Sequence, residues 1–158
     1  MRKTLLIVSL AACCALVLSS SVAMAAENWL GTWKIDTAKS KYSPGPAPKS
    51  FTLKWEATPG GIKFTSDGVA ADGKPNHSMY LSKFDGKDVA YEGNPEADTC
   101  APLKSDDSNY SNPWKKGGKP TISAKVAVSA DGKTLTITQT GMNAKGQAVN
   151  NTMVYTKQ

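Results

Sequence analysis

Arginine is almost absent from this sequence. Its one arginine, Arg2, lies at the very start of the chain, so lysine supplies nearly all of the positive charge. The planar guanidinium of arginine is the side chain best suited to bidentate phosphate contacts. The lysines are spread along the whole length and form no basic stripe of the kind that tracks nucleic acid. The composition therefore argues against nucleic acid as a partner.

Histidine and cysteine are also scarce. His77 is the single histidine, and Cys100 is the single cysteine after residue 25. One histidine and one cysteine do not make a zinc site, and no spacing gives His77 the nucleophile and orienting carboxylate that a general base needs. Asp67 and Asp72 lack the ligand spacing of a calcium loop. We therefore expect no catalytic residues, no metal site and no cofactor, and the chain is not expected to be an enzyme.

Long apolar runs occur only in the first 25 residues. A positive start is followed by the apolar run 5–18, which is too short to span a bilayer comfortably. Ala23-Met24-Ala25 then offers the small residues that signal peptidase requires. We expect residues 1–25 to be a signal peptide cleaved after Ala25, which predicts a periplasmic or secreted protein.

Two other interpretations of the leader stay open. Leu10-Ala11-Ala12-Cys13 resembles a lipobox, which would anchor the chain as a lipoprotein at Cys13 but would leave the apolar residues 15–18 on the mature side. The apolar run could instead be an uncleaved membrane anchor. A stable membrane span is not expected, because the run is short.

Cleavage after Ala25 leaves one domain, residues 26–158. Its 133 residues are enough to bury a core of their own. Loss of two basic residues leaves 17 lysines against 13 acidic residues, so the net charge falls from +6 to +4. Cys100 then has no intrachain partner, and its thiol is either buried in a monomer or the link of a disulfide-bonded dimer. Burial is the preferred interpretation.

Short runs of alternating apolar and polar residues fill this domain. In residues 50–57, for example, Phe51, Leu53 and Trp55 share one face and the polar residues share the other. Such a period of two is typical of half-buried antiparallel strands. Strands are expected near residues 30–35, 50–57, 61–67, 77–83, 88–92, 108–114, 121–128, 134–141 and 148–155.

The breaks between these runs favour tight turns. Asp-Gly-Lys occurs three times, at residues 72–74, 85–87 and 131–133, and Asp-Gly supplies the positive φ that a tight hairpin turn needs. Strands joined in this way are antiparallel neighbours, and a closed barrel leaves no free edge. The predicted fold is all-β, a single antiparallel up-and-down β-barrel of about eight to ten strands.

Two segments fit this pattern poorly. Residues 36–49 contain three prolines and are expected to form one helical turn followed by an extended, semi-rigid loop. Residues 98–114 are rich in Pro, Asp, Asn and Ser and are expected to form an irregular edge or a long loop.

The first predicted strand carries an aromatic pair around a glycine. Trp29, Gly31, Trp33 and Ile35 share one parity and are expected to face inward, with the tryptophans plugging one end of the barrel. Gly31-Thr32-Trp33 resembles the Gly-x-Trp motif of the calycin superfamily, which includes lipocalins and fatty-acid-binding proteins. The structural motif predicted here is Trp29, Gly31, Thr32 and Trp33.

A fuller likeness covers nearly all of residues 26–158. The segments GTWK, AKSKYSPGPAPKS, FDGKD, GNPEADT and VSADGKTLT are similar to those of a group of uncharacterised, exported bacterial lipocalin-like proteins. The resemblance implies a β-barrel with room for a small apolar ligand, and it implies no known activity.

The chain departs from the superfamily in three places. Lipocalins cover the motif tryptophan with an arginine, and here a lysine such as Lys157 would have to cover Trp33. Fatty-acid-binding proteins clamp a carboxylate with Arg-x-Tyr, and here Met153 replaces the arginine before Tyr155. Residues 36–49 are also too short and too rich in proline for a two-helix lid.

An interior ligand site is the remaining candidate for function. The predicted ligand-binding residues are inward by parity: Trp55, Phe64, Met79, Tyr91, Val126, Ile137, Met153 and Tyr155. The same residues would fill a packed core equally well, because side chains alone can occupy a small barrel. In a cavity, Tyr91 and Tyr155 would be the polar groups that orient a ligand.

Two functions follow from these alternatives. The first is an exported carrier of a small apolar molecule, with a small hydrophobic ligand as its partner. The second is an envelope structural or interaction protein with a packed, ligand-free barrel. The missing carboxylate clamp favours it, and so do the small residues Ala124 and Ala127, which suggest a narrow interior.

Overall fold

The computed structural model describes residues 27–158, and these residues form an all-β structure. The predicted signal peptide, its cleavage site and Cys13 lie outside the described residues. Within residues 27–158, no helix is long and apolar enough to cross a membrane. The strands are β1 (Gly31–Lys41), β2 (Ser50–Thr58), β3 (Gly61–Val69), β4 (Pro75–Ser82), β5 (Val89–Ala90), β6 (Thr99–Cys100), β7 (Leu103–Lys104), β8 (Asn109–Lys116), β9 (Lys119–Val128), β10 (Thr134–Met142) and β11 (Ala148–Lys157).

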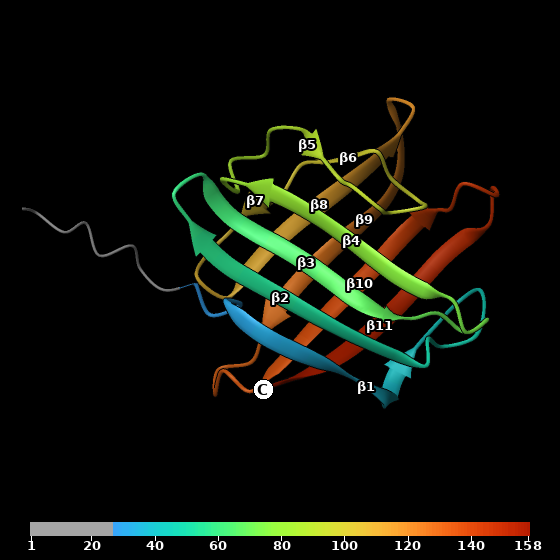
Figure 1. Ribbon diagram of the computed structural model, residues 1–158, viewed down its shortest axis with the longest axis horizontal. Coiled ribbons are helices and arrows are strands. Elements are labelled where there is room, and N and C mark those ends of the chain that lie inside the picture. Colours follow the sequence, from blue (N-terminus) through green and yellow to red (C-terminus); the bar gives the residue numbers. More distant parts are fainter. Residues whose placement is uncertain (1–26) are drawn as a thin grey trace, which may run out of the picture.

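The strands form one antiparallel sheet that curls into a nearly closed barrel (Figure 1). The order of neighbours is β4-β3-β2-β1-β11-β10-β9-β8-β6-β5, with β7 paired to β8. The two ends of this order meet at a single bridge, in which Met79 and Glu92 exchange backbone hydrogen bonds of 3.0 and 2.9 Å. The predicted antiparallel up-and-down barrel is therefore confirmed, with ten strands on its main path.

The barrel has two different ends. At one end lie the start of β1, the β2–β3 turn, the β9–β10 turn and the end of β11; we call it the plugged end. At the other lie residues 42–49, 70–74, 91–98, 117–118 and 143–147, which connect strands or their extensions; we call it the mouth. In Figure 1 the plugged end is on the left, beside the C-terminus, and the mouth is on the right.

The plugged end is filled by the aromatic residues of the opening motif. Trp29 and Trp33 are both fully buried, and the Trp33 indole N–H donates to the Trp29 carbonyl at 2.8 Å. The Trp29 ring packs against Phe84 and Tyr110, with centroids 5.8 and 5.1 Å away. Lys157 places its ammonium 5.1 Å from the centre of the Trp33 ring, a cation–π distance. The predicted inward tryptophans and the covering role of Lys157 are confirmed.

The three Asp-Gly-Lys segments share one turn geometry. The carboxylates of Asp72, Asp85 and Asp131 accept the backbone N–H of the lysine two residues later, at 3.0, 3.2 and 3.0 Å. The glycine in each has a positive φ, between 68° and 89°. Two of these turns join hairpin neighbours, β3 to β4 and β9 to β10, and the turn at Asp85 lies on the path from β4 to β5.

The helical turn predicted after residue 35 is wrong, because β1 continues to Lys41. A bulge between Asp36 and Lys41 takes its place. Asp36 binds the Lys39 N–H with its side chain and the Ser40 hydroxyl with its carbonyl, and Ser40 Oγ also accepts the Val154 N–H of β11 at 2.9 Å. These side-chain bonds keep the bulge attached to the sheet. Residues 42–49 form the extended loop that was predicted.

The inward direction predicted for Met79 is also wrong. Met79 is only half-buried and Leu81 is 45% exposed, whereas Ser78, Tyr80 and Ser82 face the interior. The reason is the register with β3, where Phe64 lies opposite Tyr80 and Ile62 opposite Ser82. Directly opposed residues share a face of the sheet, so the inward residues of β3 fix those of β4.

Cys100 lies in β6 and is fully buried, as predicted. Burial raises the pKa of its thiol to about 12. A buried, protonated thiol is not placed to link two chains, and nothing in the described residues supports a Cys100-linked dimer.

Candidate functional site

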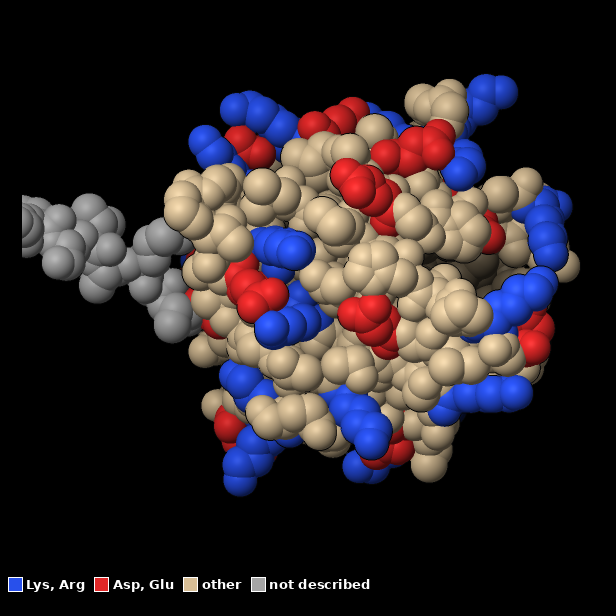
Figure 2. All heavy atoms as spheres, in the orientation of Figure 1, with Lys and Arg blue, Asp and Glu red and all other residues tan. Residues whose placement is uncertain are grey.

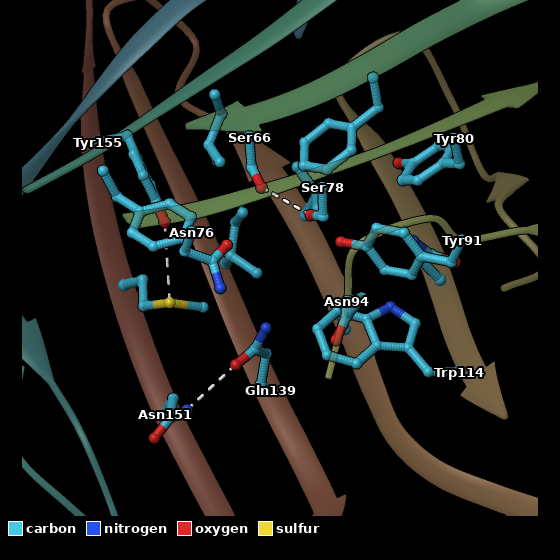
Figure 3. A pocket seen from close by; sticks show the side chains of 18 of the residues that line it. Ser66, Asn76, Ser78, Tyr80, Tyr91, Asn94, Trp114, Gln139, Asn151 and Tyr155 are labelled. Atoms are coloured by element: carbon cyan, nitrogen blue, oxygen red, sulfur yellow. Dashed lines mark hydrogen bonds between the residues drawn. The ribbon is translucent and has the colours of Figure 1, made fainter. Parts of the chain in front are cut away.

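A cavity of about 230 Å³ occupies the half of the barrel next to the mouth. Its position is visible as a hollow at the right of Figure 2, and Figure 3 shows its wall from close by. The residues of the plugged end, including Trp29 and Trp33, are not part of its lining. The buried tryptophans thus fill the interior at the plugged end, and the interior next to the mouth is hollow.

Aromatic rings form most of one wall. Phe64 stacks on Tyr80 with centroids 4.7 Å apart and meets Trp55 at 4.9 Å. Tyr91 stands edge-on to Tyr80 at 5.2 Å and to Trp114 at 5.5 Å. These contacts join rings from β2, β3, β4 and β8 into one continuous surface, because each of these strands turns an aromatic side chain inward. Such a surface can pack against a flat apolar molecule.

Neutral polar side chains complete the lining. Among residues 27–158, those that line the cavity include no Asp, Glu, Lys or His. The polar members are Ser66, Asn76, Ser78, Asn94, Asn112, Gln139 and Asn151. Ser66 and Ser78 share a buried hydrogen bond of 2.7 Å between β3 and β4. Asn112 is 3% exposed, and its side-chain oxygen has no partner.

The carboxamides at the mouth are held by their neighbours. The Asn151 side-chain oxygen accepts the backbone N–H of Ser43 at 2.9 Å, and its nitrogen donates to Gln139 Oε1 at 3.0 Å, as drawn in Figure 3. Asn94 Oδ1 accepts the backbone N–H of Glu96 at 2.8 Å. The orientation of these amides is therefore set by bonds to backbone donors.

The tyrosines of the cavity are neutral groups. Burial raises the pKa of Tyr91 to about 12, and it also raises the pKa of Tyr80, Tyr110 and Tyr155 above the ordinary value. The Tyr155 hydroxyl donates to the Met153 sulfur at 3.8 Å. Met153 and Tyr155, which occupy the positions of the Arg-x-Tyr clamp, thus lie together on the cavity wall. Among the described residues, no cationic side chain lines the cavity beside them.

Seven of the eight predicted ligand-binding residues line the cavity. They are Trp55, Phe64, Tyr91, Val126, Ile137, Met153 and Tyr155. The eighth, Met79, points away from it on the outer face of β4. Contact with a ligand stays a prediction for all seven.

Sequence reasoning missed Tyr80 and the polar lining. Asn112 has the parity of Tyr110, Gln139 that of Ile137, and Asn151 that of Met153. The alternation therefore indicates these polar residues as well as the apolar ones, since both kinds occupy inward positions.

His77 lies outside the cavity. Its Nδ1 atom is 2.6 Å from a carboxylate oxygen of Asp67, and both side chains are more than half exposed on the outer wall. Asp72 is occupied with its turn. Within residues 27–158, no three His, Cys, Asp or Glu side chains gather as a metal site would require.

Comparison with known proteins finds likeness among solved structures only. No protein-family model and no curated protein sequence matches this chain. A solved structure of a DUF3598-family protein of unknown function from Nostoc punctiforme is 18% identical with a TM-score of 0.52, covering 85% of this chain and 49% of its own. Zebrafish ileal bile acid-binding protein, solved with cholic acid, is 10% identical with a TM-score of 0.46, covering 83% of this chain and 99% of its own.

This chain spans about half the length of the Nostoc protein. At such low identity, likeness to a solved structure concerns the fold alone. The fold is a nearly closed antiparallel β-barrel, and its hollow half is large enough to hold a small molecule.

Proposed function

We propose that this chain is an exported, non-enzymatic member of the calycin-like barrels that binds a small apolar molecule in its cavity. The observation that carries the proposal is the hollow half of the barrel, walled by stacked rings and lying next to the mouth. The proposal includes the likeness to exported bacterial lipocalin-like proteins, cleavage after Ala25 and a periplasmic or secreted location.

The size of the hollow supports a binding role on energetic grounds. Protein interiors are normally close-packed. At about 24 cal/mol per Å³, a dry, enclosed cavity of about 230 Å³ would cost about 5–6 kcal/mol of folding free energy, and this hollow costs less than that because it opens at the mouth and admits water. Larger side chains at small positions such as Ala124 would remove much of this cost. A bound molecule would remove it without changing the sequence.

A second candidate function rests on the same volume. Typical ligand pockets measure roughly 300–1,000 Å³, and this cavity is smaller. An envelope structural or interaction protein that binds nothing in its interior would tolerate a small void. The two candidates differ in whether a molecule accompanies the purified protein.

Native mass spectrometry of the protein recovered from the periplasm tests the binding role. We expect a bound small molecule in the wild type and in Leu81→Ala, a matched change on the outer wall. Trp55→Leu should lose it, because Trp55 forms part of the cavity wall. An unliganded mass for the wild type, together with no binding of hydrophobic dyes, would leave the ligand-free barrel as the better account.

The mass of the recovered chain tests export separately. A chain that begins at Ala26 supports signal cleavage. A chain that retains residues 1–25, or one that carries lipid at Cys13, contradicts it.

A further inference from the structure

All charged side chains of residues 27–158 stay off the cavity wall, although lysines and acids cover the outside. Burial of an ionised carboxylate without a cationic partner is costly, because the group loses its hydration and gains nothing in return. The cavity is therefore poorly suited to an anion such as a fatty acid. It also offers no carboxylate to form an ion pair with a cation.

The mouth instead offers hydrogen-bond donors in fixed positions. The Asn94 oxygen accepts the Glu96 N–H, and its N–H₂ group, which reaches the Tyr91 hydroxyl with one N–H, has a second N–H to donate. The Gln139 side-chain oxygen accepts a hydrogen bond from the Asn151 amide nitrogen. The orientation of Asn151 is in turn fixed by the Ser43 N–H, which donates to its side-chain oxygen. In Figure 3 the Gln139 nitrogen is directed toward the middle of the cavity. Both amides would bind an oxygen that accepts hydrogen bonds.

The volume limits the size of the molecule. A dry cavity of about 150 Å³ in another protein holds benzene, and the cavity described here, at about 230 Å³, is roughly one and a half times as large. One or two fused rings fill this volume. A four-ring sterol or a long acyl chain exceeds it and would extend through the mouth into solvent.

We propose that the ligand is an uncharged, planar compound of one or two rings that carries a carbonyl or hydroxyl oxygen. Its rings lie against the aromatic wall of Phe64, Tyr91 and Trp114, and its oxygen accepts from Gln139 and Asn94. The proposal rests on the binding function above and adds the chemical class of the ligand.

Three probes with the same ring body test the class. Naphthalene has no polar group, 2-naphthol adds a hydroxyl and is uncharged at neutral pH, and 2-naphthoate adds a negative charge. Binding is followed at pH 7 by quenching of tryptophan fluorescence, because Trp55 and Trp114 line the cavity. We expect 2-naphthol to bind about three- to tenfold more tightly than naphthalene, the gain of one or two neutral hydrogen bonds. 2-Naphthoate should bind more weakly than either.

A pair of variants tests whether the preference for 2-naphthol over naphthalene comes from the amides at the mouth. Gln139→Leu should remove most of the preference for 2-naphthol over naphthalene, because only Asn94 is then left to donate, while the affinity for naphthalene itself should stay nearly unchanged. Gln158→Leu makes the same chemical change at the exposed C-terminus and should keep the preference. Unchanged naphthalene binding also shows that Gln139→Leu is folded.

The outcomes separate this proposal from the one on which it rests. Equal binding of naphthalene and 2-naphthol, or tightest binding of 2-naphthoate, overturns the ligand class but leaves a small-molecule binding protein. If none of the three probes binds, the binding function itself fails and the ligand class fails with it.

Discussion

Cys100 and Tyr91 are buried acids whose pKa values burial raises to about 12. In the unfolded chain the thiol titrates near 9 and the phenol near 10, so the unfolded state releases these protons first. A raised folded pKa stabilises the fold at lower pH, and the contribution is lost as pH rises from the unfolded toward the folded value. The free energy of unfolding should therefore fall above pH 9 from the thiol and more steeply above pH 10 as the tyrosines join.

A cysteine variant isolates the first step. Between pH 9 and pH 10, wild-type protein should lose about 1 kcal/mol more of its unfolding free energy than Cys100→Ala, the effect of one group titrating only when unfolded. Urea unfolding under reducing conditions at pH 8, 9 and 10 measures both slopes. Parallel slopes would show that the thiol does not titrate differently in the two states.

Whether a side chain faces the interior or the outside of the barrel could be predicted only where the sequence also indicated the neighbour that it contacts. Lys157 could be placed over Trp33 because a known motif supplied the contact, and the structure has it at 5.1 Å. Met79 was misplaced because β4 carries apolar residues on its outer face, which makes its own alternation misleading. Its direction follows from pairing with β3, which the sequence of β4 alone does not contain.

Among the strands, the join between β4 and β5 is the weakest part of the barrel wall. The ends of the sheet order meet only through Met79 and Glu92. Gly93 follows at once with φ of +71°, and a Cβ there would lie 2.2 Å from the His77 carbonyl oxygen. Only glycine lets the two backbones approach this closely.

Two glycine variants separate close approach from backbone conformation. Gly146→Ala has nearly the same φ, +75°, but open space around the new methyl group, so it should cost about 1–2 kcal/mol. Gly93→Ala should cost clearly more and should speed hydrogen exchange at the amides of Met79 and Glu92. Thermal unfolding and exchange mass spectrometry measure both effects. Equal costs, with unchanged exchange, would mean that the join does not depend on Gly93.

The elements that the sequence predicted well are the long hairpins. Alternation and Asp-Gly turns are local signals, and they located β2, β3, β9, β10 and β11 within a few residues. The bulge of β1 and the short strands β6 and β7 were not predicted as strands. Their pairing depends on partners distant in sequence, such as Ser40 with Val154 and Thr99 with Lys115.

The whole barrel combines a solid half with a hollow half, and only the solid half contributes fully to stability. Ala124 lines the cavity from β9, and Ala127 lies on the outer face of the same strand. A larger side chain at Ala124 would therefore fill the cavity, and the same substitution at Ala127 serves as the control.

A larger side chain in the cavity should abolish ligand binding and raise the free energy of unfolding. Ala124→Leu should abolish binding of the ring probes and raise the unfolding free energy by up to about 2 kcal/mol, through the added buried carbon atoms. Ala127→Leu should change neither property appreciably. Urea unfolding and probe titration of both variants supply the comparison. Full binding by a stably folded Ala124→Leu would mean that the ligand site lies elsewhere.

The two described chain ends lie together at the plugged end. The backbone N–H of Asn28 donates to Asp107, and that of Gln158 donates to Thr32, so both ends are attached to the side opposite the mouth (Figure 1). A protein immobilised through either end on a sensor surface or a bead would present its opening to the solution. A tether at Glu27 or at Gln158 would leave the route into the cavity unobstructed in surface-based binding measurements.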